Sequence, residues 1–283
     1  MEIFIRPTYD EMNRVAAQEV ASILNTKPNA VLGMATGSTP LGVYRELVRM
    51  HQEGKLDFSQ VTTFNLDEYV GLPVTHPQSY HQFMFEHFFQ HVNIPKQNIY
   101  IPSGTTSNYL AFCQWYEDRI QECGGIDLQI LGIGSDGHIA FNEPGSALSS
   151  RTRLKTLAKQ TIDDNARFFD RRDDVPVYAI TMGIGTILEA RKILLLANGR
   201  QKATAIARAI EGPMTSMITA SELQMHPTVK VFLDDEAASE LMMTGWKRSD
   251  PAHRRSVSGK NFVDDSRLTP GRDDLFLAIV MVD

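Results

Sequence analysis

The sequence has 283 residues, of which 42% are hydrophobic and 22% are charged, the composition of an ordinary globular protein. Its net charge of −6 argues against general nucleic-acid binding, because a phosphate backbone demands a basic surface. No apolar stretch approaches the roughly 20 residues of a membrane span, and the start lacks the pattern of a signal peptide. Two cysteines, Cys113 and Cys123, match neither a disulfide framework nor a zinc-ligand spacing. We therefore expect a reduced, cytoplasmic protein that binds neither membrane nor nucleic acid.

Short apolar runs alternate with amphipathic stretches, which is typical of a parallel sheet flanked by helices. The first strand is predicted over residues 2–6, and Thr8 and Glu11 then form the pattern of a capping box that opens a helix. After the second strand, Pro40 suits the start of a helix and Gly54 its end. The remaining strands are predicted over residues 30–35, 61–66, 126–134, 175–183, 192–198 and 229–235.

Helices are predicted between these strands. Ser79 and Gln82 suit the capped start of an aromatic-rich helix over residues 80–92, and each of the last three strands is followed by a plausible helix. Between about residues 144 and 175 the pattern weakens, with many Arg, Ser, Thr and Asp. We interpret this segment as a loop or lid over the carboxyl edge of the sheet.

The predicted fold class is α/β: an open, mostly parallel, Rossmann-like sheet flanked by helices. We expect a single domain over residues 1–245, with a lid segment at about 144–182. The polar region over residues 246–283 shows no sustained period, and we interpret it as a divergent tail or linker.

Open parallel sheets bind ligands beyond the carboxyl ends of their strands. The first such position carries Gly37, Ser38 and Thr39, between a strand and the helix that Pro40 opens. Glycine lets a ligand approach the backbone, hydroxyls donate hydrogen bonds, and the positive end of a helix dipole favours an anion. A phosphate site is one reading, and a tight turn with a Ser or Thr cap is the other.

The second position carries two adjacent carboxylates, Asp67 and Glu68, directly after the strand at 61–66. Neighbouring side chains of a strand point in opposite directions, so the two should have different environments. One could act as a base while the other pairs elsewhere. The alternative is a solvated acidic turn.

The third position is the glycine-rich segment 132–144, which holds Asp136, His138 and Glu143 within eight residues. Histidine titrates near neutral pH and can take and return a proton, and a flanking carboxylate orients it. These residue types also bind metals, but no second histidine stands at a recognised ligand spacing, so we expect no metal.

Two cations are candidates to complete an anion site. Arg167 lies in the expected lid, and Lys202 stands at a strand-to-helix junction. Arginine binds phosphate with a planar fork, and lysine adds a compact charge. Either could equally be a surface charge.

Taken together, these motifs closely resemble the glucosamine-6-phosphate deaminase/isomerase family. The resemblance is carried by TFNLDEYVGL (63–72), HPQSYHQFM (76–84) and GIGSDGHIAFNEPGSALSSRTRLKTL (132–157), and it runs almost continuously to about residue 245. The related sugar-phosphate lactonases share the Asp-Gly-His core but usually lack the following Asn-Glu-Pro. The third motif is therefore the most specific.

The resemblance implies roles for the matching residues. Asp67 would be the base that moves a proton between carbons 2 and 1 of the open sugar, and His138 would open the ring with Asp136 and Glu143 orienting it or relaying protons. The phosphate contacts implied in the same way come from Gly37, Ser38, Thr39, Arg167 and Lys202. Ser38 stands where some family members have glycine.

The implied reaction converts glucosamine 6-phosphate to fructose 6-phosphate and ammonia in amino-sugar (N-acetylglucosamine) catabolism. No hydride leaves and the substrate's own carbonyl accepts the electrons, so no cofactor is expected.

The resemblance also raises regulation, because some bacterial members are hexamers activated by N-acetylglucosamine 6-phosphate. Ser146, Arg153, Lys155 and Thr156 match part of that second phosphate site. A homo-oligomer, with a hexamer as one option, is therefore expected. The family's remaining contact comes from a C-terminal tyrosine region, and residues 247–283 contain no tyrosine.

Two other functions compete with the deaminase. A 6-phosphogluconolactonase would keep the fold but hydrolyse an ester, for which no enolising base is needed. A sugar-phosphate sensing module would carry an N-terminal helix-turn-helix, whereas this chain opens with a predicted strand.

Overall fold

The main sheet of the protein is entirely parallel. The computed structural model describes residues 1–242 and 247–248, and within them eight strands pair in the order β11-β1-β10-β9-β6-β2-β3-β5. These strands are β1 (Glu2–Arg6), β2 (Val31–Met34), β3 (Thr62–Asn65), β5 (Ile99–Tyr100), β6 (Leu128–Leu131), β9 (Ile193–Ala197), β10 (Val229–Asp234) and β11 (Lys247–Arg248). The predicted fold class, an open parallel sheet flanked by helices, is confirmed. Apart from β11, the predicted tail over 246–283 lies outside the described residues.

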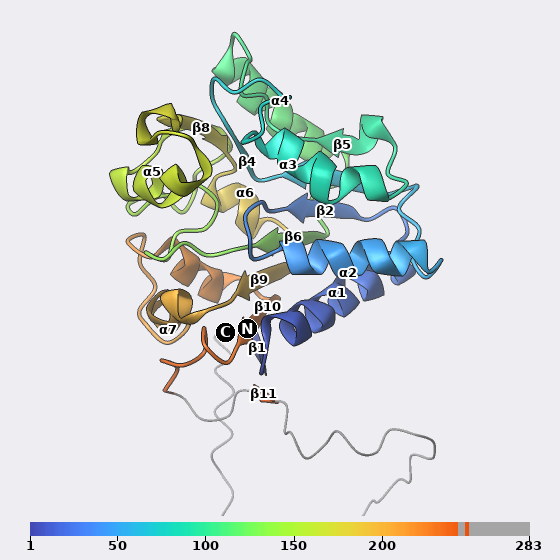
Figure 1. The fold of residues 1–283 in the computed structure, drawn as a ribbon, viewed down its shortest axis with the longest axis vertical. Helices are drawn as coiled ribbons and strands as arrows, with labels where there is room; N and C mark the ends of the chain where they lie inside the picture. The colour runs from blue at the N-terminus through green and yellow to red at the C-terminus, as the bar shows by residue number, and fades with distance from the viewer. Residues whose placement is uncertain (243–246, 249–283) are drawn as a thin grey trace, which may run out of the picture. The chain divides into compact units, whose positions relative to one another are not determined.

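The central strands are apolar because helices cover both of their faces. Every residue of β2, β6 and β9 is buried, as expected for a parallel sheet with helices on each side. The helices are α1 (Tyr9–Thr26), α2 (Leu41–Gln52), α3 (Tyr80–His87), α4 (Tyr109–Glu122), α5 (Lys159–Asn165), α6 (Ile184–Leu188) and α7 (Ala203–Ile210). Helix α1 packs beside α2, and α2 beside α3 (Figure 1). None of the helices within the described residues is long and apolar enough to cross a bilayer.

Side-chain caps set the starts of two helices where the sequence predicted them. The Thr8 hydroxyl accepts a hydrogen bond from the Glu11 amide at 3.2 Å and caps α1. The Ser79 hydroxyl accepts one from the Gln82 amide at 3.0 Å and caps α3. Each cap satisfies an amide that has no partner inside its helix, which stabilises the helix by about 1 kcal/mol.

A second, three-stranded sheet holds the segment that the sequence predicted as a loop or lid. Strands β4 (Asp67–Tyr69), β8 (Tyr178–Thr181) and β7 (Arg153–Thr156) pair antiparallel in the order β4-β8-β7. The prediction of loop over 144–175 was therefore wrong for β7 and α5. Strand β7 has no apolar run, because it is a short edge strand whose residues are half-buried or exposed. Figure 1 shows β4, β8 and α5 grouped beside the main sheet.

Two other expectations need correction, and one short strand was not predicted. The helix predicted over 80–92 ends at His87, and Phe89–His91 form a short 3-10 helix instead. The residues after β10, 235–240, form turns and not a helix. Strand β5 was not predicted, since two residues are too few to show a period. Cys113 and Cys123 are free thiols, in keeping with the expectation of no disulfide framework.

Candidate active site

A cleft of about 420 Å³ lies at the carboxyl ends of four adjacent strands. Residues that follow β2, β3, β6 and β9 line it, together with residues from α5 and the start of α3. The chain runs outward from β2 to β3 and β5 on one side, and from β6 to β9 and β10 on the other. The cleft therefore sits where the strand order reverses, the usual ligand site of such sheets.

The two adjacent carboxylates take different environments, as their positions in a strand predicted. Glu68 points away from the cleft and accepts hydrogen bonds from the backbone amides of Tyr69, Tyr80 and His81, each at 2.9 Å. Two of these donors are the first amides of α3, so Glu68 also joins β4 to that helix. Asp67 lines the cleft, is only 6% exposed, and accepts no hydrogen bond from the described residues.

Burial decides the protonation of Asp67. It raises the pKa of Asp67 from the ordinary 3.8 to about 8, and the nearby charge of Glu68 contributes in the same direction. Burial also raises the pKa of Glu68, although the three backbone amides partly offset this. A carboxylate with a pKa near 8 is a much stronger base than an exposed aspartate. Asp67 is thus suited to abstracting a proton from carbon.

His138 lies in the cleft and is backed by two carboxylates. Its Nδ1 is 2.7 Å from Asp136 Oδ1 and 4.0 Å from Glu143 Oε2. Burial alone would raise the pKa of Asp136, but the close contact with the His138 imidazole and its charge lower that pKa. Neither Asp136 nor Glu143 lines the cleft itself. Because Nδ1 faces the carboxylates, Nε2 is the nitrogen left for a ligand.

Glu143 is held in place by residues at the start of α5. Its Oε1 accepts hydrogen bonds from the Thr161 hydroxyl at 2.7 Å and from the Ala158 amide at 3.0 Å. Its Oε2, the oxygen toward His138, is buried without a hydrogen bond in the described structure. A carboxylate oxygen left free at this point can accept a proton from the imidazole or from a ligand.

The loop that carries His138 is strained and anchored. Ala140 has φ of 49°, the only positive φ of a non-glycine residue among those described, and such strain is common at functional sites. The Asn142 side chain holds the loop by donating hydrogen bonds to the Ile139 carbonyl at 3.1 Å and the Met182 carbonyl at 2.8 Å. This anchoring is a physical reason for asparagine in the Asn-Glu-Pro motif.

The loop over residues 36–39 faces the cleft from the end of β2. Gly37 takes φ of 95°, which a residue with a side chain rarely adopts. The Tyr9 hydroxyl, from the start of α1, lies 3.0 Å from the carbonyls of both Ser38 and Thr39 and accepts a hydrogen bond from the Gly42 amide at 2.9 Å. The Tyr9 hydroxyl therefore ties the loop to the start of α1 and to the start of α2.

Two cations complete this end of the cleft. Lys202 and Arg167 both line it, from the junction after β9 and from the lid segment respectively. Burial lowers the pKa of Lys202, while the charges of Asp164 and Asp136 partly offset this and that of Arg167 adds to it. Two cations close enough to influence each other favour an anion between them.

Several residues of the cleft were not singled out from the sequence. Tyr80 lines it and stacks on Phe141, with ring centroids 6.0 Å apart. Asn198, the last residue of the strand predicted over 192–198, accepts a hydrogen bond from the Thr39 hydroxyl at 2.8 Å. Because Asn198 ends a predicted strand, its position could have marked it as a candidate ligand-binding residue. Tyr9 offered none, because only the packing of α1 beside α2 brings it to the loop.

The residues that matched a second phosphate site are partly brought together. Arg153 Nη2 lies 3.4 Å from the Ser146 hydroxyl, and burial lowers the pKa of Arg153. No carboxylate among the described residues forms an ion pair with Arg153. Lys155 stands two positions after Arg153 in β7 and therefore lies on the same face of the strand as Arg153. Thr156 lies on the opposite face.

Metal ligation was the rival reading of the histidine. Asp136, His138 and Glu143 form the only group of three within the described residues whose donor atoms lie within 4.8 Å of one another. These three would be the ligands if a metal bound here. The close 2.7 Å contact between Asp136 and His138 is equally that of an acid-base pair.

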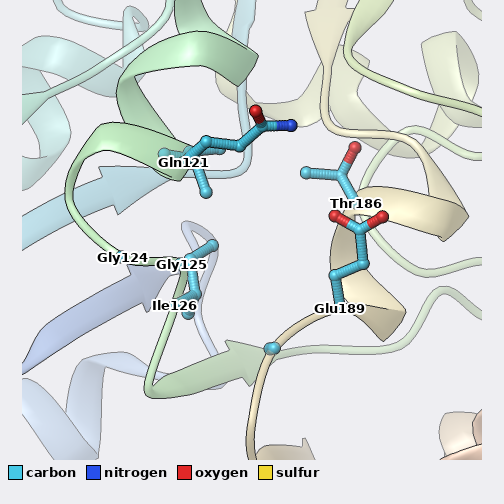
Figure 2. Close-up of a pocket in the computed structure, with 8 residues that line it drawn as sticks. Gln121, Gly124, Gly125, Ile126, Thr186 and Glu189 are labelled. Atoms are coloured by element: carbon cyan, nitrogen blue, oxygen red, sulfur yellow. The ribbon is translucent and has the colours of Figure 1, made fainter.

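A second hollow of about 320 Å³ lies at the opposite edge of the sheet, before β6 and β9 (Figure 2). Gln121, Thr186 and Glu189 point into it. Glu189 is paired with Arg151 at 2.5 Å, and the Thr186 hydroxyl donates to the buried Glu117. Its polar groups serve to join α4 to α6 and the small sheet, so this hollow lacks the free acid, base and cations of the cleft.

Comparisons with known proteins converge on one family. The model of glucosamine-6-phosphate isomerases/6-phosphogluconolactonase matches residues 7–232. Glucosamine-6-phosphate deaminase of Halothermothrix orenii is 54% identical over 241 residues, which cover 85% of this chain and 100% of the relative. The same enzyme of Thermoanaerobacter pseudethanolicus is 51% identical over 239 residues, covering 84% and 94% of the two chains.

Solved structures agree on the fold. A monomeric glucosamine-6-phosphate deaminase superposes with a TM-score of 0.83 at 46% identity and covers 85% of this chain and 100% of its own. The 6-phosphogluconolactonase of Trypanosoma brucei reaches a TM-score of 0.68 at 20% identity, covering 85% and 98%. At 20% identity, the similarity to the 6-phosphogluconolactonase shows a shared fold and nothing about activity.

Proposed function

The chain belongs to the family of glucosamine-6-phosphate isomerases and 6-phosphogluconolactonases, and on this premise we propose that it acts as a glucosamine-6-phosphate deaminase in amino-sugar catabolism. The observation that carries the proposal is the presence of the buried base Asp67, the imidazole of His138 and the loop over 36–39 in one cleft. The products would be fructose 6-phosphate and ammonia. We place the reaction in the cytoplasm.

The first step would open the pyranose ring. His138, with Nδ1 held by Asp136 at 2.7 Å, would take the proton of the anomeric hydroxyl through Nε2 and return a proton to the ring oxygen. The negative charges of Asp136 and Glu143 would stabilise the imidazolium formed in between. The ring C–O bond breaks and carbon 1 becomes an aldehyde.

The second step would move a proton between carbons. The new aldehyde acidifies the hydrogen on carbon 2, and Asp67 would remove it to form an enolamine and then protonate carbon 1. The ketimine left at carbon 2 is hydrolysed by water, which breaks the C–N bond and releases ammonia. The raised pKa of Asp67 supports this assignment, because a stronger base lowers the barrier to abstracting a carbon acid's proton.

The phosphate would bind at the other end of the cleft. Its oxygens would accept hydrogen bonds from the amides and hydroxyls of Gly37, Ser38 and Thr39 and pair with Arg167 and Lys202. The contacts of the Tyr9 hydroxyl with the Ser38 and Thr39 carbonyls support this role, since they hold the backbone of the loop in one arrangement. Remote contacts of this kind hold the flexible open chain in register.

The direct test is to incubate the purified protein with glucosamine 6-phosphate and follow ammonia and fructose 6-phosphate together. We expect the two products in equal amounts, with the same rate in the presence of EDTA. Ammonia without fructose 6-phosphate would contradict the proposed route. A strict metal requirement would instead assign Asp136, His138 and Glu143 to metal binding.

The lactonase is the alternative on the same fold. Hydrolysis of a sugar-phosphate lactone needs no base on carbon 2, so a buried Asp67 with a raised pKa would have no task in it. We expect hydrolysis of 6-phosphogluconolactone at no more than the uncatalysed rate. Rapid lactone hydrolysis with no ammonia release from glucosamine 6-phosphate would reverse the order of the two proposals.

The Tyr9 hydroxyl provides a test of the phosphate loop. The Ser38 carbonyl and the Thr39 amide belong to one planar trans peptide, in which the C=O and N–H groups point in opposite directions. Because Tyr9 holds the carbonyl on its own side, the Thr39 N–H points away from Tyr9. We expect Tyr9→Phe to raise KM for glucosamine 6-phosphate about 3- to 10-fold, the value of a net hydrogen bond, with kcat nearly unchanged. Tyr100→Phe is the matched control, because among the described residues the Tyr100 hydroxyl is hydrogen-bonded only to Arg119. An unchanged KM in Tyr9→Phe would exclude this role.

We also propose that Ser146, Arg153, Lys155 and Thr156 contribute to a second anion site, for N-acetylglucosamine 6-phosphate, in a homo-oligomer. The half-buried guanidinium of Arg153, close to the Ser146 hydroxyl, supports it. The similarity to a monomeric deaminase weighs against the oligomer. Sedimentation with and without the activator tests both parts, and hyperbolic kinetics insensitive to it would exclude activation.

A further inference from the structure

Gly132 has no structural reason to be glycine. Every other glycine among residues 1–242 has a structural reason to be glycine, and these glycines fall into two groups. The first group has positive φ: Gly37, Gly54, Gly71, Gly124, Gly125, Gly137, Gly145 and Gly199. In the second group a Cβ would lie 3.0 Å or less from another atom: Gly33, Gly42, Gly104, Gly134, Gly183, Gly185 and Gly212. Only Gly132, within that range, has an ordinary φ and no atom within 4 Å of an added Cβ.

The open space beside Gly132 is the cleft. Gly132 directly follows Leu131, the last residue of β6, and it lines the cleft. Strand β6 lies between β2 and β9, so Gly132 sits between the loop over 36–39 and the junction that carries Lys202. Apart from its two chain neighbours, an added methyl group would have no protein atom within 4 Å, and it would occupy volume available to a ligand.

We propose that Gly132 is a specificity-determining residue, against whose bare backbone the carbon chain of the sugar phosphate lies. Glycine permits the closest approach of a ligand to a backbone. Strand β6 lies beside β2, and Gly132 begins the loop that carries His138. An extended six-carbon chain that runs from a phosphate at the loop over 36–39 toward His138 would therefore lie along this backbone. This inference rests on the proposed function and adds the path of the substrate between the two ends of the cleft.

Gly132→Ala tests the inference. We expect an unchanged or slightly higher melting temperature, because alanine reduces the entropy of the unfolded chain at a site where its φ is allowed. We expect kcat/KM for glucosamine 6-phosphate to fall about 10- to 100-fold, since a displacement of about 1 Å at the reacting atoms has an effect of that size. Gly54→Ala, at an exposed site with φ of 72°, is the control with the opposite pattern: lower stability and unchanged kinetics.

Equilibrium binding measurements distinguish an effect on the sugar chain from an effect on the phosphate group. Without ammonia, fructose 6-phosphate binds but cannot react backward, so calorimetry can compare it with inorganic phosphate in both proteins. The inference predicts at least a tenfold loss of affinity for fructose 6-phosphate in Gly132→Ala and less than a twofold change for inorganic phosphate. Equal losses for both ligands, or no loss for either, would overturn it. If the unmodified protein releases no ammonia, the proposed function fails; if it does and Gly132→Ala is fully active, only this inference fails.

Discussion

Asp67→Asn is expected to lower kcat for ammonia release about 10²- to 10⁴-fold, the usual contribution of a general base. Asparagine keeps the shape of the side chain but cannot accept the proton of carbon 2. KM should change little, because the substitution leaves the proposed phosphate contacts, the loop over 36–39, Arg167 and Lys202, unaltered. Steady-state kinetics with coupled detection of ammonia measure both quantities. Full activity in this variant would refute the role of Asp67.

The same substitution should stabilise the protein at alkaline pH. The pKa of Asp67 is about 8 in the folded protein and near 3.8 when exposed, so between these values the folded state binds the extra proton. The free energy of unfolding therefore falls as pH rises from about 4 to about 8, and the loss is complete above pH 8. Asp67→Asn removes this cost, with a gain of about 2–5 kcal/mol at pH 9 that disappears toward pH 4.

Denaturant melts at pH 4, 7 and 9 measure this dependence. Asp118→Asn, on the exposed face of α4, is the matched control and should change neither kinetics nor the pH dependence of stability.

The pH profile of kcat/KM offers an independent readout. It should rise with pH up to about 8, since the base must be deprotonated in the free enzyme. A rising limb near pH 4 would mean that Asp67 is not buried as described.

Gly134→Ala is expected to lower kcat about 10²-fold by displacing His138. An added Cβ would lie 2.4 Å from His138 Cε1 and 2.8 Å from Asp136 Oδ1, closer than real contacts allow. The imidazole must then shift by about 1 Å, and a misplacement of that size at the reacting groups has this effect on rate. Affinity for inorganic phosphate should be retained, because the loop over 36–39 is untouched.

Gly212→Ala is the control for this substitution. Its Cβ would lie 2.4 Å from the Arg208 carbonyl, an equally tight contact outside the cleft. We expect it to lower the melting temperature and leave kcat within twofold. If Gly134→Ala lost activity only in proportion to its loss of stability, the glycine would serve folding and not the placement of His138.

Local patterns in the sequence were sufficient for most of the main sheet. Strand β9 is a continuous apolar run because both of its faces are buried, and that pattern is visible without any partner. Caps such as Thr8 and Ser79 act within three residues, so they too could be predicted. The small sheet could not, because β7 is a polar edge strand and β4 owes its pairing to β8, more than 100 residues away.

The candidate site likewise has features that the sequence predicts and features that only the fold determines. The sequence alone showed which residue types stand at the three strand ends, including Asp67 and His138, because residue identity and its distance from a predicted strand are local properties. Only the tertiary structure decided that Glu68 is bound by the amides of α3 while Asp67 lies buried in the cleft. Only the tertiary structure, too, brought Tyr9 to the loop over 36–39. The reason is physical: residue identity is a local property, whereas burial, pKa and the partner of a hydrogen bond depend on segments that meet only when the chain folds.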